Sequence, residues 1–279
     1  MFIGILLTAL LPAVVQTPAP VKPLAIINAT LQQFEDGPPI PSGHAFIAGE
    51  MVFFSMQVRG YQVAPDQKIR LTYRVDTLDS EGAPLAEANT GKVETESSYE
   101  DRDWLPKIRH SVLIPPHALS GQFRISAWVK DEISGQERKA EVAFQVQGRQ
   151  VETSGTLTLR NFRFLRAEED REPLAVASYK PGDTLWARFD ITGFKAGEKN
   201  HIRVVYGISI VGPSGKVLLS NPQAAAEEDT PFYPRRYLPE IMSLNVQPKT
   251  TAGEYTLVVS VRDEVGQQTF ESRQAFRIE

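Results

Sequence analysis

The chain alternates apolar and polar positions in many short runs, with a period of two residues. One such run has apolar residues at Val52, Phe54, Met56 and Val58, and polar residues between them at Ser55, Gln57 and Arg59. The same alternation recurs at Ile69, Leu71, Tyr73 and Val75, and again at Phe123, Ile125, Ala127 and Val129. A period of two predicts β-strands with one buried face. Gly, Pro, Asp and Ser clusters between the runs predict turns.

This pattern occurs twice along the chain. Residues 49–61 are matched by residues 182–194, at an offset of 133 positions (182 − 49). The run that begins at Ile69 recurs from Ile202 at the same offset, and Leu105-Pro106 recurs as Leu238-Pro239. Towards the end the offset becomes 132, with Phe123 matched by Tyr255, which indicates one small insertion or deletion. The chain is therefore predicted to contain an internal duplication.

The duplication predicts a division of the chain. Residues 24–147 form one domain, 148–154 a short polar linker and 155–279 a second domain, after an N-terminal segment at 1–23. Each domain of about 120 residues carries roughly seven short strands and few helical patterns, as expected for an antiparallel β-sandwich. The predicted fold class is all-β.

The stretch around Tyr255 resembles part of a known fold. Gly253-Glu254-Tyr255 leads into an alternating run that ends at Asp263, which looks like the penultimate strand of an immunoglobulin-like or fibronectin-type domain. The resemblance implies a tyrosine corner, in which the Tyr255 hydroxyl holds the preceding loop. The first copy has Phe123 here, so it has no hydroxyl for a corner. The full expectation is two tandem immunoglobulin-like β-sandwiches of bacterial type, related by duplication and preceded by a signal-like segment.

The N-terminal segment predicts export. Residues 2–15 are almost continuously apolar and are followed by a proline-rich spacer at 16–23. The apolar run is too short for an ordinary transmembrane helix and fits the hydrophobic region of a signal peptide. No Lys or Arg precedes it and no clear small-x-small cleavage site follows, so both a cleaved signal and an uncleaved anchor stay open. We expect a periplasmic or cell-surface protein that contacts the membrane only through this segment.

Charge and composition exclude several classes of protein and of functional site. The net charge is −4 with acidic and basic residues mixed, which excludes the basic stripe of a nucleic-acid-binding protein. Cysteine is absent, so disulfides, thiolate metal sites and a cysteine nucleophile are excluded.

No motif for catalysis is present. The glycine-rich stretch at 212–216 ends in a lysine followed by Val217 and matches a hairpin turn of the first copy, so it is interpreted as a turn. The four histidines have no metal-ligand spacing, and His110, aligned with Ser243, is expected to be exposed. Acidic residues before Trp104 lack the spacing of a calcium loop. We predict no catalytic residue, no cofactor and no metal site, and we leave calcium binding by a loop open.

Aromatic residues are the best candidates for binding. Phe53 and Trp186 occupy equivalent outward positions in the two copies, and Trp128 also points outward by alternation. Phe232 and Tyr233 lie in a loop of the second copy and have no close counterpart in the first. These five are the predicted partner-binding residues, because outward aromatic rings anchor proteins or stack on sugars. Trp104 and Tyr237, each directly before a Leu-Pro pair, are expected to be buried plugs.

These observations lead to three hypotheses. The first is a non-catalytic exported protein of the bacterial cell envelope that binds an unknown protein partner through loop aromatics or strand edges and acts as a scaffold. The alternative is a carbohydrate-binding module that accompanies a separate enzyme. A more remote alternative is a hydrolase with a site that matches no standard motif.

Overall fold

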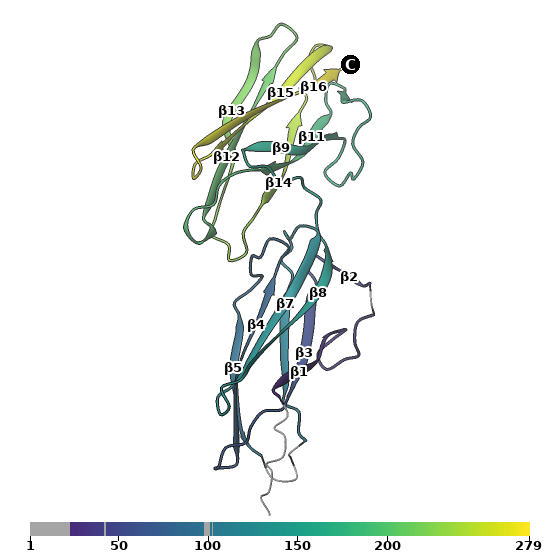
Figure 1. Ribbon diagram of the computed structural model, residues 1–279. Helices are drawn as coiled ribbons and strands as arrows, with labels where there is room; N and C mark the ends of the chain where they lie inside the picture. Colours follow the sequence, from purple (N-terminus) through teal and green to yellow (C-terminus); the bar gives the residue numbers. More distant parts are fainter. Residues whose placement is uncertain (1–22, 42, 98–100, 102) are drawn as a thin grey trace, which may run out of the picture.

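The computed structural model describes residues 23–41, 43–97, 101 and 103–279. They form two β-sandwich units stacked end to end, the first with strands β1–β8 and the second with strands β9–β16 (Figure 1). The predicted export segment lies almost entirely outside the described residues. Among the described residues, no helix is both long and apolar enough to cross a membrane.

The strands of the first unit are short and follow one another closely: β1 (Ala25–Gln32), β2 (Ala45–Ile47), β3 (Met51–Arg59), β4 (Lys68–Leu78), β5 (Asn89–Glu96), β6 (Lys107–Leu113), β7 (Gly121–Asp131) and β8 (Glu137–Gln147). Those of the second unit are β9 (Thr158–Leu165), β10 (Ser178–Tyr179), β11 (Thr184–Thr192), β12 (Ile202–Val211), β13 (Val217–Asp229), β14 (Tyr237–Asn245), β15 (Gly253–Asp263) and β16 (Gln268–Ile278). One 3-10 turn, η1 (Glu198–Asn200), precedes β12.

Both units have the same strand order, as the repeat predicts. In the first, a three-stranded sheet β1-β3-β6 faces a five-stranded sheet β2-β8-β7-β4-β5. In the second, β9-β11-β14 faces β10-β16-β15-β12-β13 in the corresponding order. The pairs are antiparallel except β2 with β8 and β10 with β16. The structure therefore confirms two immunoglobulin-like β-sandwiches.

The alternating apolar residues fill the space between the sheets of each unit. The inward residues of β3, Val52, Phe54, Met56 and Val58, are all buried, as predicted. One expectation for this strand is wrong, because Ser55 is also buried. The core of the second unit is built the same way, around Leu185, Phe189, Leu257 and Ile278. Such interdigitated apolar cores supply most of the stability of a sandwich.

The repeated backbone features have a conformational cause. Gly49 and Gly182 have φ values of 94° and 99°, a region that residues with a Cβ rarely adopt. Asn28 and Asn161 both have φ of 52° and lie at a bulge in the first strand of each unit. Asparagine tolerates this left-handed conformation better than most residues, so its recurrence at the bulge follows from the backbone.

Strand register corrects the alignment of the two copies. Gln57 pairs with Lys107, and its counterpart Asp190 pairs with Pro239, so the offset is already 132 at β6 and β14. Matching Leu105-Pro106 with Leu238-Pro239 was therefore wrong by one residue. The counterpart of His110 is Met242 rather than Ser243, and His110 is only 8% exposed. Its Nε2 lies 2.9 Å from the Thr77 hydroxyl inside the first unit. Burial of the ring lowers the pKa of His110.

The tyrosine corner is confirmed. The Tyr255 hydroxyl donates a hydrogen bond to the Thr251 carbonyl at 2.7 Å, four residues upstream in the preceding loop. Phe123, at the equivalent place in the first unit, is buried and has no hydroxyl to make this bond. The corner is therefore specific to the second unit.

Candidate functional site

The five predicted binding residues lie on separate surfaces. Phe53 and Trp186 are half-buried on the outward faces of β3 and β11, and Trp128 is half-buried on β7, where its Nε1 donates to Glu137 Oε2 at 3.1 Å. Phe232 is 52% exposed, whereas Tyr233 is only 7% exposed. The structure therefore does not gather the five residues into one site.

Tyr233 instead joins the two units. Its ring belongs to the hydrophobic cluster of the first unit, although it lies in the loop at residues 230–236 between β13 and β14 of the second. The Tyr233 hydroxyl donates to Asp79 Oδ2 at 2.8 Å. Asp79 lies at the turn after β4 and is 1% exposed. Tyr233 is thus already occupied by a contact within the chain.

Arg236 completes this contact. Its Nη2 lies 2.6 Å from Asp79 Oδ2, its Nε lies 2.9 Å from Glu81 Oε2, and its Nη1 donates to the Tyr233 hydroxyl at 2.8 Å. We call Asp79, Glu81, Tyr233 and Arg236 the clamp. Because every polar group here has a partner, the cost of burying the Asp79 charge is offset.

The protonation of Asp79 reflects the clamp. Burial alone would raise the pKa of Asp79, but the hydrogen bond from Tyr233, the amide of Ala83 and the Arg236 guanidinium together hold this pKa below its usual value. Asp79 Oδ1 also accepts hydrogen bonds from the amides of Glu81 and Ala83. The Asp79 carboxylate therefore stabilises the turn after β4 through Oδ1 and contacts the second unit through Oδ2.

A second contact between the units runs through the connecting segment. Arg149 forms a β-bridge with Leu119 of the first unit, and its Nη2 lies 2.7 Å from Oδ1 of the fully buried Asp190 in the second. Its guanidinium also lies 5.7 Å from the centre of the Tyr237 ring, a cation–π distance. Arg149 thus holds the connecting segment to both units.

Sequence reasoning missed the charged residues of these contacts. Asp79 corresponds to Gly212 and Asp190 to Gln57, so each charge occurs in only one copy. A charged residue in one copy that faces an uncharged residue in the other copy was the sequence signal that could have indicated these contacts. The plug prediction was half right, because Tyr237 is buried but Trp104 is 43% exposed.

A groove on the first unit is an open site that includes one of the predicted binding residues, Phe53. It has a volume of about 320 Å³ and lies over β3 and β6, beside the segment before β5. We call it the Phe53 groove. Its lining combines aromatic, charged and amide side chains, including Phe53, Glu35, Glu87, Asn89, Arg109 and His110. Mixed linings of this kind bind ligands that have both an apolar face and polar groups.

One wall of the Phe53 groove is fixed by ion pairs. Arg109 contacts the Asp36 carboxylate through Nε and Nη2, at 2.9 and 2.8 Å, and Lys107 contacts the same carboxylate. Hydrogen bonds from Arg109 and then Lys107 lower the pKa of Asp36 to about 2. Asn89 Nδ2 donates to the Arg109 carbonyl at 2.9 Å and ties β5 to β6 across the seam between the sheets. The groove is therefore held open by a defined frame.

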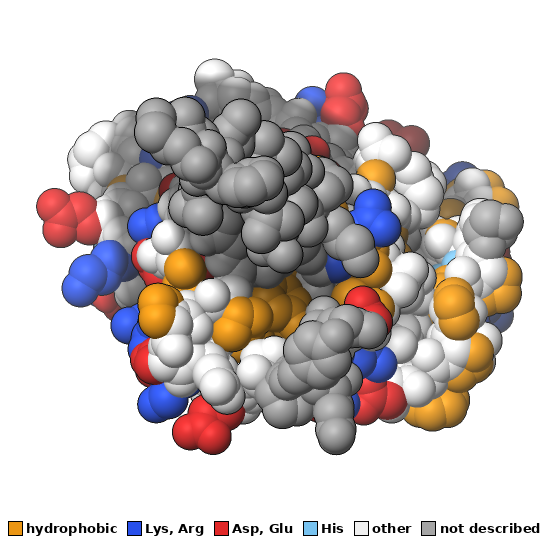
Figure 2. Space-filling view, turned by 60° about the horizontal axis from the view of Figure 1, so that its bottom comes forward, with side chains coloured by type: hydrophobic (Ala, Val, Ile, Leu, Met, Phe, Trp, Pro, Cys, Tyr) orange, Lys and Arg blue, Asp and Glu red, His pale blue; other side chains and the backbone are white. Residues whose placement is uncertain are grey.

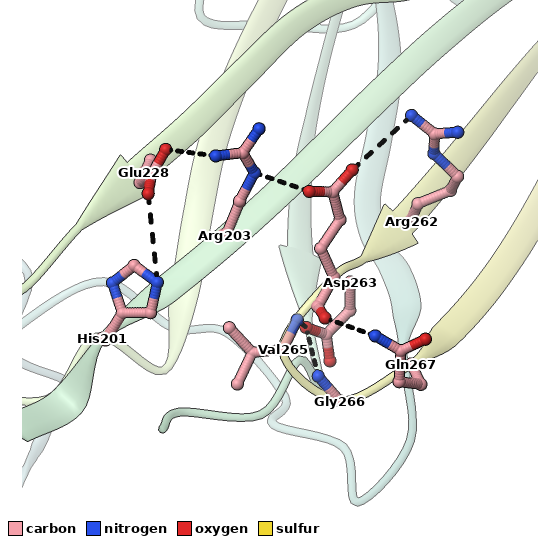
Figure 3. A network of polar contacts seen from close by, with 9 residues as sticks. His201, Arg203, Glu228, Arg262, Asp263, Val265, Gly266 and Gln267 are labelled. Atoms are coloured by element: carbon pink, nitrogen blue, oxygen red, sulfur yellow. Dashed lines mark hydrogen bonds and ion pairs between the residues drawn. The ribbon is translucent and has the colours of Figure 1, made fainter. Parts of the chain in front are cut away.

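A charged cluster on the second unit is internally paired. Arg203 pairs with Glu228 and with Glu264. Figure 3 shows Arg203 beside Glu228, and Asp263 accepting hydrogen bonds from the amides of Val265 and Gly266. On the face shown in Figure 2, basic and acidic side chains are interspersed around a hydrophobic area. Within the described ranges, no three His, Cys, Asp or Glu residues are grouped as metal ligands would be.

Comparisons with known proteins give only distant likenesses. No protein-family model and no curated protein matches the sequence. Among solved structures, the C-terminal domain of the Streptococcus agalactiae AgI/II polypeptide BspA matches with 9% identity and a TM-score of 0.31, over 92% of this chain and 100% of that one. The C-terminal domain of the Streptococcus pyogenes antigen I/II-family protein AspA matches with 10% identity and a TM-score of 0.32, over 93% and 99%. At these values the likenesses establish neither a family nor a function.

Proposed function

We propose that the chain is a non-catalytic binding and scaffold protein, exported to the bacterial periplasm or cell surface. In this proposal the clamp makes the two sandwiches one stiff body, and the Phe53 groove binds a protein partner. The export segment supports the location, and the clamp is the observation that carries the scaffold role.

The clamp supports a scaffold role because of its burial. Domains joined by a flexible linker move relative to one another unless their interface is well packed. Here Tyr233 enters the hydrophobic cluster of the other unit, and Arg236 and Arg149 add charged contacts on either side. A stiff body of this kind holds a bound partner at a defined distance and direction from the envelope.

The Phe53 groove supports a binding role. Phe53 supplies an aromatic surface next to Arg109 and Glu87, and aromatic and arginine side chains dominate the binding energy of protein interfaces. Phe232, exposed on the second unit, is a further proposed contact. A partner peptide with one apolar side chain and one group that donates hydrogen bonds would match the ring and the carboxylates of Glu35 and Glu87.

The test is capture of a partner from an envelope extract by the purified chain. We expect the wild-type chain to retain a protein that Phe53→Ala and Arg109→Gln lose, and that Leu113→Ala, an exposed control on the same strand as Arg109, still retains. If all four chains retain the same proteins, the groove is not the binding site. Recovery of the chain in the cytoplasmic fraction would contradict the proposed location.

A carbohydrate-binding module is the second candidate, favoured by one observation. The Phe53 groove places an aromatic ring among amide and carboxylate groups, which is also how sugars are bound. A glycan array would separate the two candidates. Binding that is lost in Phe53→Ala would identify a sugar ligand, whereas protein capture without any glycan signal would support the first candidate.

A further inference from the structure

The equal strand order of the two units means that each end of one unit has a counterpart on the other. The end of the first unit that carries the β4–β5 turn, at residues 79–82, is covered by the β13–β14 loop of the second unit. Its counterpart on the second unit carries the β12–β13 turn, at residues 212–215, and lies at the far end of the molecule, near the C-terminus (Figure 1). One end is thus covered within the chain and the equivalent end is open.

The side chains at these two ends differ in exposure. In the first unit, the amide of Leu85 donates a hydrogen bond to the carbonyl of Thr77. In the second unit, the residue that corresponds to Thr77 is Ile210, and it pairs with Leu219. Leu85 and Leu219 therefore occupy equivalent positions. Leu85 is 5% exposed in the first unit, whereas Leu219 is 43% exposed in the second. Val217 and Leu218 beside it are exposed as well. Three adjacent exposed apolar residues on an edge strand are unusual unless something covers them.

A groove opens at this uncovered end. It has a volume of about 220 Å³ and leads between the two sheets to residues of the core, with a lining that includes Leu185, Leu218, Leu219, Leu244, Tyr255 and Ile278. We call it the outer groove. Pockets for small-molecule ligands usually exceed about 300 Å³, so the outer groove suits one large apolar side chain better than a free ligand.

The first unit carries such a side chain at the end that faces away from the second unit. The loop before β6 is the counterpart of the loop before β14, which covers the first unit. Strand register places Trp104 at the position of Arg236 in the clamp. Trp104 is 43% exposed, and its carbonyl accepts a hydrogen bond from the Tyr61 hydroxyl at 2.6 Å, which fixes the backbone there. An exposed indole and an open apolar groove therefore lie at opposite ends of one molecule.

We propose that the outer groove binds the Trp104 side chain of a second copy of this chain, head to tail. The contact places an aromatic side chain of one molecule in the end of another sandwich, as Tyr233 does between the two units of one molecule. Because the two contacting surfaces differ, each added copy leaves one groove and one Trp104 free, and the assembly grows as an open filament rather than closing as a dimer. A filament of stiff units extends the proposed scaffold role, but the contact does not depend on the Phe53 groove.

The test is sedimentation velocity of the purified chain over a wide range of concentrations. We expect the average mass to rise beyond that of a dimer, and Leu219→Glu or Trp104→Ala to weaken association at least tenfold. Val176→Glu, which changes an exposed apolar residue elsewhere on the second unit, is the matched control and should associate like the wild type.

A mixture of the two variants makes the test specific. Leu219→Glu keeps its Trp104 side chain and Trp104→Ala keeps its outer groove. An equimolar mixture should therefore form a one-to-one dimer that neither variant forms alone. The proposal is overturned if the chain stays monomeric at every concentration. It is overturned as well if such a monomeric chain binds some other protein at the outer groove. A closed dimer that neither substitution weakens also overturns it.

Discussion

The Asp79 carboxylate and the Tyr233 hydroxyl, 154 residues apart in the sequence, lie 2.8 Å apart in the fold. This hydrogen bond connects a turn of the first unit to a loop of the second, and Arg236 reinforces it. It explains why an aromatic residue without a counterpart in the other copy is nevertheless buried. It is one of the contacts that join the two sandwiches, together with those of Arg149.

Removal of the Asp79 carboxylate should loosen the clamp. Asp79→Ala leaves the Tyr233 hydroxyl and the Arg236 guanidinium without their buried acceptor, and breaking a buried ion pair in this way costs about 3–5 kcal/mol. Urea unfolding followed by fluorescence should show this loss. Asp66→Ala, which removes an exposed ion pair with Arg70, is the control and should cost much less, because exposed ion pairs contribute little to stability. Equal effects of the two substitutions would contradict the role of Asp79.

Acid should weaken the same contact. The pKa of Asp79 is lowered in the folded chain, so its ionised form is favoured by folding. Its stabilising contribution is therefore fully present above the ordinary pKa of aspartate, about 3.9, and is lost as the pH falls through the lower folded value. A pH titration of unfolding should show a smaller loss of stability at low pH in Asp79→Ala than in the wild type. The same loss in both would contradict the assignment.

Glu240 should give the opposite pH dependence. Burial and then repulsion from Glu227 raise the pKa of Glu240 to about 7, against a hydrogen bond from Tyr206 that lowers it. Because folding favours the protonated form, stability should fall as the pH rises from about 4.5 to 7. Glu240→Gln should remove this fall and stabilise the chain at pH 8 by on the order of 1–2 kcal/mol, after allowance for solvent screening. An unchanged pH profile would count against the raised pKa.

The tyrosine corner should contribute modestly and only to the second unit. Tyr255→Phe removes the hydrogen bond to the Thr251 carbonyl and keeps the ring, so a loss of about 1 kcal/mol is expected. Phe123 shows that the fold accepts phenylalanine at the equivalent position. Hydrogen exchange should become faster in the loop around Thr251 and stay unchanged in the first unit. Uniformly faster exchange would show that the substitution acts on the whole chain.

Two glycines of the second unit should differ sharply in tolerance. Gly182 and Gly193 both have positive φ, but a Cβ on Gly193 would lie 1.9 Å from the Thr156 carbonyl oxygen, whereas a Cβ on Gly182 meets nothing within 4 Å. Gly182→Ala should therefore cost only the backbone strain, about 1–2 kcal/mol. Gly193→Ala should cost clearly more, as urea unfolding would show. Similar costs would mean that the Thr156 backbone moves away freely.

The fold was predictable because it depends on local patterns. Burial of one face of each strand imposes the alternation at Val52, Phe54 and Met56, and positive φ favours glycine at the same turns in both copies. Alternation gives the side of a strand on which a residue lies but says little about what covers that side. Ser55 is therefore buried on a side predicted to be outward.

The contacts between units were not predictable in the same way. Asp79, Tyr233 and Arg236 meet only after both sandwiches have formed and been placed end to end. The aromatic character of the 230–236 loop correctly drew attention to Tyr233, but its burial depends on the other unit. A one-residue error in aligning the copies also placed Trp104 opposite Tyr237, one of which is exposed and the other buried.

The central claim is that the clamp makes the two units one stiff body, and a distance measurement between them tests it most directly. The chain contains no cysteine, so Glu141→Cys and Ser260→Cys, both at exposed strand positions, introduce one spin label in each unit. We predict a single narrow distribution of distances that broadens when Asp79→Ala is added. A distribution that is already broad in the chain with an intact clamp would contradict the claim.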